Sequence, residues 1–192
     1  MKRAVTGIVL AGGASRRMGR DKGFVSYKGK TLIEYSIENI KCVCDSIIIS
    51  SNKVSKYNNL NYPIIKDITD PIGPIGGIYS CLLASKTTDN LIISCDIPEL
   101  YPATLDFLLS NKQDYEIVVP QHDDGHFEPL AGYYSKKIIP VLEKAITNKN
   151  YKLMDLFKQV GFKSTLVKLP EDILEKDLLL KIDELNNNNE ID

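Results

Sequence analysis

The sequence has no excess of either charge. Its 24 lysines and arginines are balanced by 25 aspartates and glutamates, which gives a formal net charge of −1. Nucleic-acid and membrane-surface binders rely on an excess of positive charge, so the balance argues against both partners. No apolar run reaches the roughly 18 residues that span a bilayer, and the N-terminus lacks the apolar segment of a signal peptide. We therefore expect a cytoplasmic protein that recognises anions locally.

Cysteine and histidine are also scarce. The four cysteines are Cys42, Cys44, Cys81 and Cys95. They form no C-x-x-C pair and are too few for a disulfide scaffold, so we interpret them as small buried or half-buried thiols. The two histidines, His122 and His126, flank a glycine and have no cysteine nearby. This spacing is unlike a helical pair of metal ligands and favours a solvated loop.

Short apolar runs alternate with segments of helical spacing. The runs are rich in Ile, Val and Leu without polar alternation, as in parallel strands that helices cover on both faces. They are residues 7–11 (GIVLA), 46–50 (SIIIS), 91–95 (LIISC) and 116–120 (EIVVP). The expected helices are residues 32–40, 78–83, 103–109, 138–146 and 152–160. The alternation predicts an α/β fold, a three-layer α/β/α sandwich with a mostly parallel, Rossmann-like sheet.

Local signals refine this outline. Thr31 and Glu34 have the spacing of a capping box before the first helix, and the second helix is expected to begin after Gly76–Gly77. Residues 128–134 (EPLAGYY) are interpreted as a strand that reverses the sheet direction. The length of 192 residues suits one domain, which we place at residues 1–185. The polar residues 186–192 (NNNNEID) are expected to fray.

The segment LAGGASRRMGRDK, residues 10–22, follows the first predicted strand directly. Ligands of an open parallel sheet bind beyond the carboxyl ends of the strands. Gly12 and Gly13 lack a Cβ atom, so backbone N–H groups there can approach phosphate oxygens closely. The cations that add charge suited to phosphate are Arg16, Arg17, Arg20 and Lys22. The segment predicts a triphosphate-binding loop rather than a solvated basic turn.

Two better-known phosphate loops are excluded by spacing. The glycine pair is followed by Ala14-Ser15 and does not supply the G-x-G-x-x-G of a dinucleotide site. Residues 23–31 (GFVSYKGKT) end like a P-loop, but five residues lie between Gly23 and Gly29 where that motif has four. The enclosed residues are also bulky for a phosphate cradle.

Acidic residues follow two further predicted strands. Asp96 comes directly after residues 91–95, at the sheet edge where the glycine loop is expected. Mg²⁺ prefers one or two carboxylates together with substrate phosphates and water, so Asp96 is the candidate metal ligand, with turn capping as the structural alternative. Asp67 and Asp70 precede a Gly/Pro stretch that leads into a helix N-terminus, a position that favours anions.

These motifs resemble a known family. Residues 10–22 are similar to the L-A-G-G-x-S-x-R-M-G-x-D-K signature of nucleotidyltransferases, most closely to the MobA family of molybdenum cofactor guanylyltransferases, over roughly residues 5–160. The resemblance implies that Leu10, Ala11 and Gly12 meet the GTP base and ribose through main-chain atoms. It implies that Lys22 binds phosphates and that Arg17 stabilises transition-state charge. It also assigns Mg²⁺ binding to Asp96, within C-D-x-P.

The resemblance extends unevenly beyond these motifs. Asp67, after a short strand at residues 63–66 and before a G-P-L-x-G-like stretch, takes a nucleotide-contact role, with Asp70 as the alternative. The guanine-recognising asparagine of the family aligns with Ser50, and Asn52, two residues later, is the candidate nucleotide-binding residue. Residues 128–130 (EPL) resemble a Q-P-L element beside the acceptor site. The family's N-x-N-T-P-E segment near the pterin is not reproduced by residues 180–185 (LKIDEL).

The function implied is Mg²⁺-dependent transfer of GMP from GTP to the terminal phosphate of molybdenum-molybdopterin, with release of pyrophosphate. GTP and molybdenum-molybdopterin would be the substrates, and transient contact with other molybdenum-cofactor proteins would follow. No residue need act as a nucleophile, because positioning and electrostatics dominate such a transfer. The alternatives are a cytidylyltransferase acting on molybdopterin or on a sugar or polyol phosphate, and a nucleotide-binding regulatory module without turnover.

Overall fold

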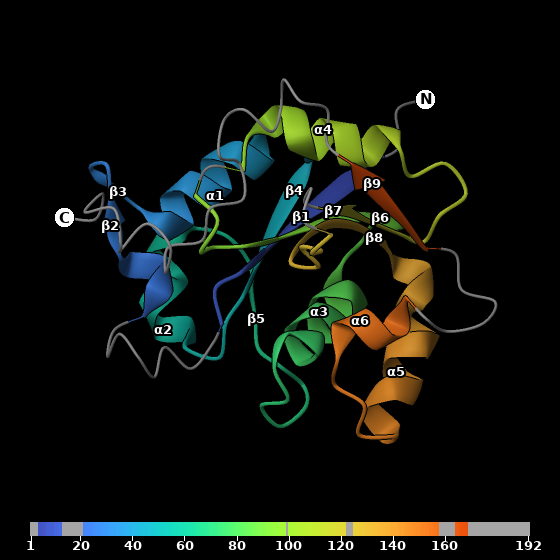
Figure 1. The fold of residues 1–192 in the computed structure, drawn as a ribbon. Coiled ribbons are helices and arrows are strands. Elements are labelled where there is room, and N and C mark those ends of the chain that lie inside the picture. The colour runs from blue at the N-terminus through green and yellow to red at the C-terminus, as the bar shows by residue number, and fades with distance from the viewer. Residues whose placement is uncertain (1–3, 13–20, 99, 122–124, 158–163, 169–192) are drawn as a thin grey trace.

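A single mixed sheet forms the centre of the molecule (Figure 1). The computed structural model describes residues 4–12, 21–98, 100–121, 125–157 and the backbone of 164–168. Within these residues the sheet has seven strands. In spatial order they are β5 (Ile64–Ile65), β4 (Ser46–Ser50), β1 (Val5–Leu10), β6 (Asp89–Ser94), β8 (Ala131–Ser135), β7 (Ile117–Gln121) and β9 (Ser164–Lys168).

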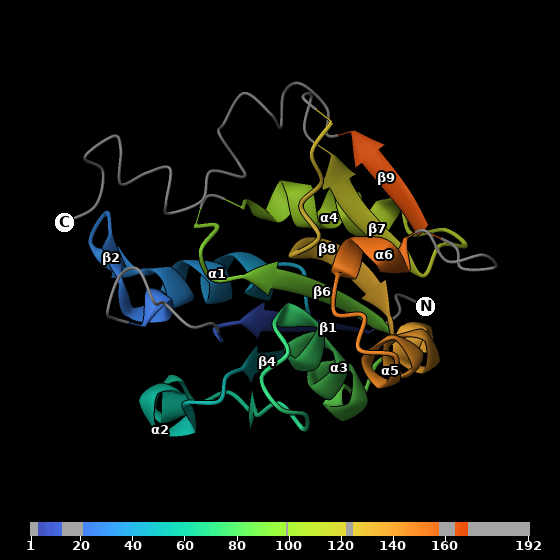
Figure 2. The ribbon, with the colours of Figure 1, turned by 60° about the horizontal axis from the view of Figure 1, so that its bottom comes forward.

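The sheet is parallel except at β8. Strand β1 pairs in parallel with β4 and β6, whereas β8 runs antiparallel to both β6 and β7. The predicted reversal of sheet direction is thereby confirmed, although β8 begins at Ala131 and not at Glu128. In Figure 2 the arrowheads of β1 and β6 point to the side of the molecule where β2 (Ser26–Tyr27) and α2 (Val54–Tyr57) lie.

Helices cover both faces of the sheet, which confirms the three-layer sandwich. Successive side chains of a strand point to opposite faces of the sheet, so neighbouring residues of one strand belong to different cores. Val9 and Ile93 pack in one core with α1 (Leu32–Lys41) and α4 (Pro102–Ser110). Ile8 and Ile92 pack in a second core on the other face. The helices of that face are α3 (Pro74–Ala84), α5 (Ile139–Thr147) and α6 (Leu153–Leu156).

Most local expectations hold, and the start of one helix is corrected. The capping box is present, because the Thr31 N–H donates to Glu34 Oε2 at 2.8 Å. Helix α3, however, begins at Pro74, so Gly76 and Gly77 lie inside the helix. The pair permits close packing and does not mark a start: a Cβ on Gly77 would lie 2.7 Å from Ser50 Oγ. Of the helix expected at residues 152–160, the described part is α6, which ends at Leu156.

Several predicted features lie outside the described residues. These are Gly13, Arg16, Arg17, Arg20, His122, Gly161 and the segments 180–185 and 186–192. All four cysteines are free, as expected, but Cys42 is exposed and only the other three are buried or half-buried. Burial raises the pKa of the Cys81 thiol to about 12. In the part of the chain that the structure describes, we find no helix with the length and apolar character needed to cross a membrane.

Candidate active site

The predicted site residues converge at one edge of the sheet. Gly12, Asn52, Asp67 and Asp96 follow the carboxyl ends of β1, β4, β5 and β6 respectively. Strands β4 and β5, which follow β1 in the chain, lie on one side of β1 in the sheet, and the later strand β6 lies on its other side. The boundary between β1 and β6 is therefore a topological switch point, where open α/β sheets bind ligands. The Cys95 N–H donates to the Leu10 carbonyl at 3.1 Å across this boundary.

Lys22 and Asp96 face each other across the switch point. Lys22 opens the three-residue 3-10 helix η1 (Lys22–Phe24), and its Nζ lies 3.2 Å from Asp96 Oδ2. The two side chains keep 28% and 19% of their surface exposed, so both remain accessible to a ligand. Ser94 Oγ donates to the other carboxylate oxygen, Asp96 Oδ1, at 2.5 Å. Ser94 was not among the predicted site residues, although its place two residues before a strand-end aspartate is visible in the sequence.

Asn52 and Asp67 form a reciprocal pair at the ends of β4 and β5. Asn52 Nδ2 donates to Asp67 Oδ2 at 2.9 Å, and the Asp67 N–H donates to Asn52 Oδ1 at 3.0 Å. Ser50, which aligns with the asparagine position of the family, is instead buried beneath α3 and hydrogen bonds to Cys81. Of the two candidates, Asn52 is therefore the one whose side chain is exposed at the site.

The remaining predicted site residues differ in how exposed their side chains are. Asp67 belongs to the reciprocal pair with Asn52, whereas Asp70 is exposed and takes no part in that pair. The Glu128 side chain is buried, but the turn that it begins reaches the site edge, because the Ser94 N–H donates to the Leu130 carbonyl at 2.7 Å. His126 is exposed, and the described residues hold no group of three or more potential metal ligands.

The aspartate that precedes Lys22 in the signature, Asp21, is buried, although its place in the sequence indicated no role for it. Asp21 accepts a 2.6 Å hydrogen bond from Tyr57 Oη on Oδ1, and Lys53 Nζ lies 3.2 Å from Oδ2. Burial alone would raise the pKa of the Asp21 carboxyl, but the bonds from Tyr57 and Lys53 outweigh it and hold the pKa below the ordinary 3.8. Tyr57 lies on the four-residue helix α2, and Lys53 directly precedes that helix. This segment contains no recognisable sequence motif.

This network predicts an acid-dependent contribution to stability. A carboxyl whose folded pKa is depressed stabilises the fold above its unfolded pKa, and the contribution is lost as the pH falls through the folded value. The charged groups that face Asp21 are Lys53 and, at 3.9 Å, Lys56, with the Tyr57 hydroxyl and the Cys95 thiol close by. We expect the urea midpoint of wild type to exceed that of Asp21→Asn at pH 7, and the difference to shrink below pH 3.8. A difference independent of pH would show that the charge of Asp21 does not stabilise the fold.

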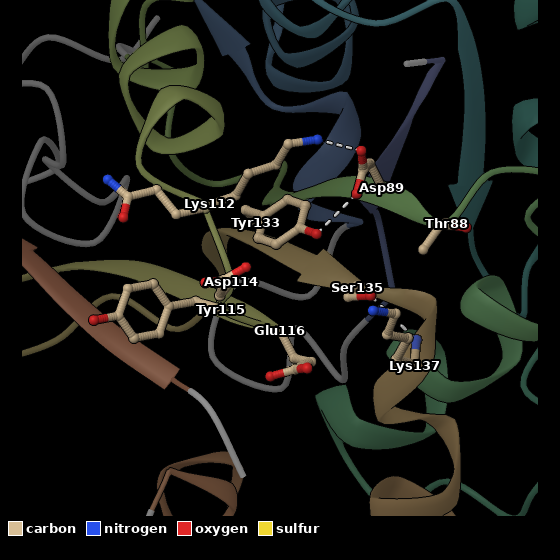
Figure 3. Close-up of a pocket in the computed structure, with 10 residues that line it drawn as sticks. Thr88, Asp89, Lys112, Asp114, Tyr115, Glu116, Tyr133, Ser135 and Lys137 are labelled. Atoms are coloured by element: carbon tan, nitrogen blue, oxygen red, sulfur yellow. Dashed lines mark hydrogen bonds and ion pairs between the residues drawn. The ribbon is translucent and has the colours of Figure 1, made fainter.

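The structure also contains a cavity of about 300 Å³ at the opposite edge of the sheet. It lies at the amino ends of β6 and β7, between the segment 112–116 and the end of β8 (Figure 3). Asp89 at its wall accepts a 2.8 Å hydrogen bond from Tyr133 Oη and also contacts Lys112 Nζ. The cavity is therefore separate from the residues that the sequence predicts to bind nucleotide.

The fold and the site together define a class of protein. A mostly parallel α/β sheet with a glycine at the end of β1, a lysine after the loop and an aspartate at the end of β6 is the arrangement that the sequence leads us to expect of a nucleotidyltransferase. Residues 7–164 match the profile of the MobA-like NTP transferase domain, and the chain belongs to this family.

Individual relatives agree with this assignment. A protein of Flavobacterium johnsoniae named "probable molybdenum cofactor guanylyltransferase" is 38% identical over 157 residues, which are 81% of this chain and 82% of the relative. The "molybdenum cofactor guanylyltransferase" of Desulfosudis oleivorans is 35% identical over 143 residues, 73% of this chain and 70% of that one.

Solved structures share the fold. A crystal structure of a protein from Aquifex aeolicus is 30% identical and superimposes with a TM-score of 0.77, covering 92% of both chains. The "molybdopterin-guanine dinucleotide biosynthesis protein A" of Archaeoglobus fulgidus is 23% identical, with a TM-score of 0.76 and 95% of both chains covered. At that identity the second likeness concerns the fold.

Proposed function

We propose that the protein transfers GMP from Mg²⁺-bound GTP to the terminal phosphate of molybdenum-molybdopterin and releases pyrophosphate. The observation that carries the proposal is the pairing of Lys22 with Asp96 at 3.2 Å across the switch point between β1 and β6. A cation for phosphates and an acid for a metal then lie within reach of one triphosphate. The names of the relatives supply the guanylyl group as the group transferred and the molybdenum cofactor as its acceptor.

In the proposed reaction the acceptor phosphate attacks the α-phosphorus of GTP, and the bond to the β-phosphate breaks. Lys22, and Arg17 of the loop, neutralise the charge of the departing pyrophosphate. Main-chain atoms of Leu10, Ala11, Gly12 and Gly13 hold the nucleotide at the end of β1. The protein acts by positioning and electrostatic stabilisation, since the attacking oxygen comes from the acceptor itself.

The residues at this edge fit a bound Mg²⁺ ion. Mg²⁺ keeps several waters and takes one or two protein carboxylates together with substrate phosphates. Asp96 is such a carboxylate: it is partly exposed, and Ser94 holds its Oδ1 in place. When bound there, the ion would offset charge on the phosphate oxygens. Asp96 is thus the proposed ligand, and the protein would carry out the reaction in the cytoplasm.

Asn52 and Asp67 are the proposed contacts to the nucleoside. Their mutual hydrogen bonds orient the amide and the carboxylate at the ends of neighbouring strands, and each group retains unused donor or acceptor capacity. A carboxylate oxygen accepts from hydroxyl or amino groups, whereas the amide can both donate and accept. The turn at residues 128–130 is the proposed neighbour of the acceptor, through the backbone bond from Ser94 to Leu130.

The four nucleoside triphosphates distinguish the proposal from its alternatives. We expect GTP with Mg²⁺ to raise the melting temperature most, because a ligand at a hundred times its Kd stabilises by about 2.7 kcal/mol. Adding molybdenum-molybdopterin should then release pyrophosphate. A preference for CTP would contradict guanylyl transfer. Binding of GTP without pyrophosphate release would instead indicate a regulatory module.

A further inference from the structure

Lys22 has little local structure to hold it in place. It begins a 3-10 helix of three residues, which is closed by backbone bonds from Phe24 to Asp21 and from Val25 to Lys22. Helices this short are marginal by themselves, so the position of Lys22 depends on tertiary contacts. Beside the bond from Lys22 itself to Asp96, the preceding residue supplies such contacts: the side chain of Asp21 is 6% exposed and makes the bonds to Tyr57 and Lys53 described above.

Tyr57 connects this turn to the end of β1. Its fully buried hydroxyl lies 2.6 Å from Asp21 Oδ1 and 3.2 Å from the Ala11 carbonyl oxygen, so its single hydrogen is shared between two acceptors. Gly23 permits the close approach, because a Cβ at that position would lie 2.7 Å from Tyr57 Oη. The Phe24 ring packs on the Tyr57 ring with centroids 4.9 Å apart. One side chain from α2 thus contacts both ends of the predicted triphosphate loop.

We propose that Tyr57 and Asp21 are positioning residues that hold Lys22 in register with the end of β1 and with Asp96. The inference rests on the proposed function, in which Lys22 acts on the phosphates. Asp21 precedes Lys22 directly, so fixing its carboxylate fixes the Lys22 backbone against Ala11. Without the Tyr57 hydroxyl, the turn is held through Asp21 by the half-exposed Lys53, and the Lys22 backbone is fixed less firmly against Ala11. Displacement of a charged group by about 1 Å is enough to slow a reaction by up to roughly a hundredfold.

A second tyrosine provides a matched control. Tyr133 donates to the buried Asp89 at 2.8 Å, and Asp89 also contacts a lysine, Lys112. This network resembles that of Tyr57, Asp21 and Lys53, because a tyrosine hydroxyl and a lysine both contact a buried aspartate (Figure 3). It lies at the opposite end of the strands, where β6 begins. Removing either hydroxyl leaves a buried carboxylate with one bond fewer, so both phenylalanine variants should lose stability. Only the change at Tyr57 should affect the reaction.

The experiment compares Tyr57→Phe with Tyr133→Phe in urea unfolding and in pyrophosphate release at saturating substrates. We expect both variants to unfold at lower urea. Tyr57→Phe should lower kcat about tenfold while changing the KM for GTP less than about threefold, because the lost interaction is one that positions the charge for the transition state. Tyr133→Phe should keep the wild-type kcat. Equal kcat values in the two variants would overturn the proposal.

A double-mutant cycle with Lys22→Gln separates positioning from a purely structural effect. If Tyr57 acts through Lys22, Tyr57→Phe should lower kcat no further in the Lys22→Gln background. An additive loss would overturn the role of Tyr57 while leaving the proposed function intact. Wild-type kcat in Lys22→Gln alone would overturn the role of Lys22, and the positioning proposal with it. Should Tyr57→Phe not fold, Lys53→Met removes the half-exposed partner of Asp21 and is read in the same cycle.

Discussion

Replacing Asp96 with asparagine is expected to lower the rate of pyrophosphate release about a thousandfold and to leave the melting temperature within a few degrees of wild type. The amide keeps the size of the side chain but loses the charge that would bind Mg²⁺, and such a loss costs several kcal/mol in the transition state. The effect on stability is small because an ion pair between partly exposed groups contributes only about 0–1 kcal/mol.

Asp106→Asn is the matched control for this measurement. Asp106 is an exposed aspartate on α4, so the same chemical change there should alter neither turnover nor unfolding. If Asp96→Asn unfolded while Asp106→Asn did not, the Asp96 carboxylate would be structural. If the Asp96 variant turned over at the wild-type rate, the metal would have to be held by other groups.

The strands could be predicted because burial on both faces of the sheet selects apolar residues. Ile47, Ile48 and Ile49 at the centre of β4 are buried on alternating faces, so both faces are apolar there. Uninterrupted apolar runs are the result. The direction of β8 could be predicted for a different reason, since a short connection from β7 favours an antiparallel neighbour.

The start of α3 was predicted wrongly because glycine has more than one use. Gly76 and Gly77 were interpreted as the boundary of a helix, whereas both lie inside it and pack closely against other segments of the chain. Cβ atoms there would come within 2.9 Å of Thr69 Oγ1 and 2.7 Å of Ser50 Oγ. Close approach between elements distant in sequence leaves no local pattern, so the two causes of a glycine pair cannot be told apart from sequence.

Some residues of the candidate site could likewise be predicted from the sequence, and others could not. Asp96, Asp67 and Asn52 could be placed together because parallel strands end at one edge, so the order of strands and acids is sufficient. Tyr57 could not, because it lies 36 residues from Asp21 on a four-residue helix without a characteristic motif. Its role follows from where its hydroxyl lies, and that depends on how α2 packs.

The Lys22→Gln variant is expected to lose about a hundredfold in rate and to differ from Asp96→Asn in the sign of its effect on metal-free GTP binding. In wild type the ammonium and the carboxylate lie 3.2 Å apart and largely cancel each other's charge. Removing the carboxylate leaves the positive charge of Lys22 for the triphosphate, so affinity without metal should rise. Removing the ammonium leaves the negative charge of Asp96 facing the phosphates, so affinity should fall.

Equilibrium titration of GTP at low salt, with EDTA and then with Mg²⁺, measures both effects. A charge-assisted hydrogen bond contributes about 1.5 kcal/mol or more, so each shift in the metal-free Kd should be about tenfold and in opposite directions. With Mg²⁺ present both variants should bind more weakly than wild type, because one lacks a metal ligand and the other a phosphate ligand. Shifts of the same sign without metal would mean that the triphosphate does not lie between Lys22 and Asp96, and the proposed placement of GTP would be wrong.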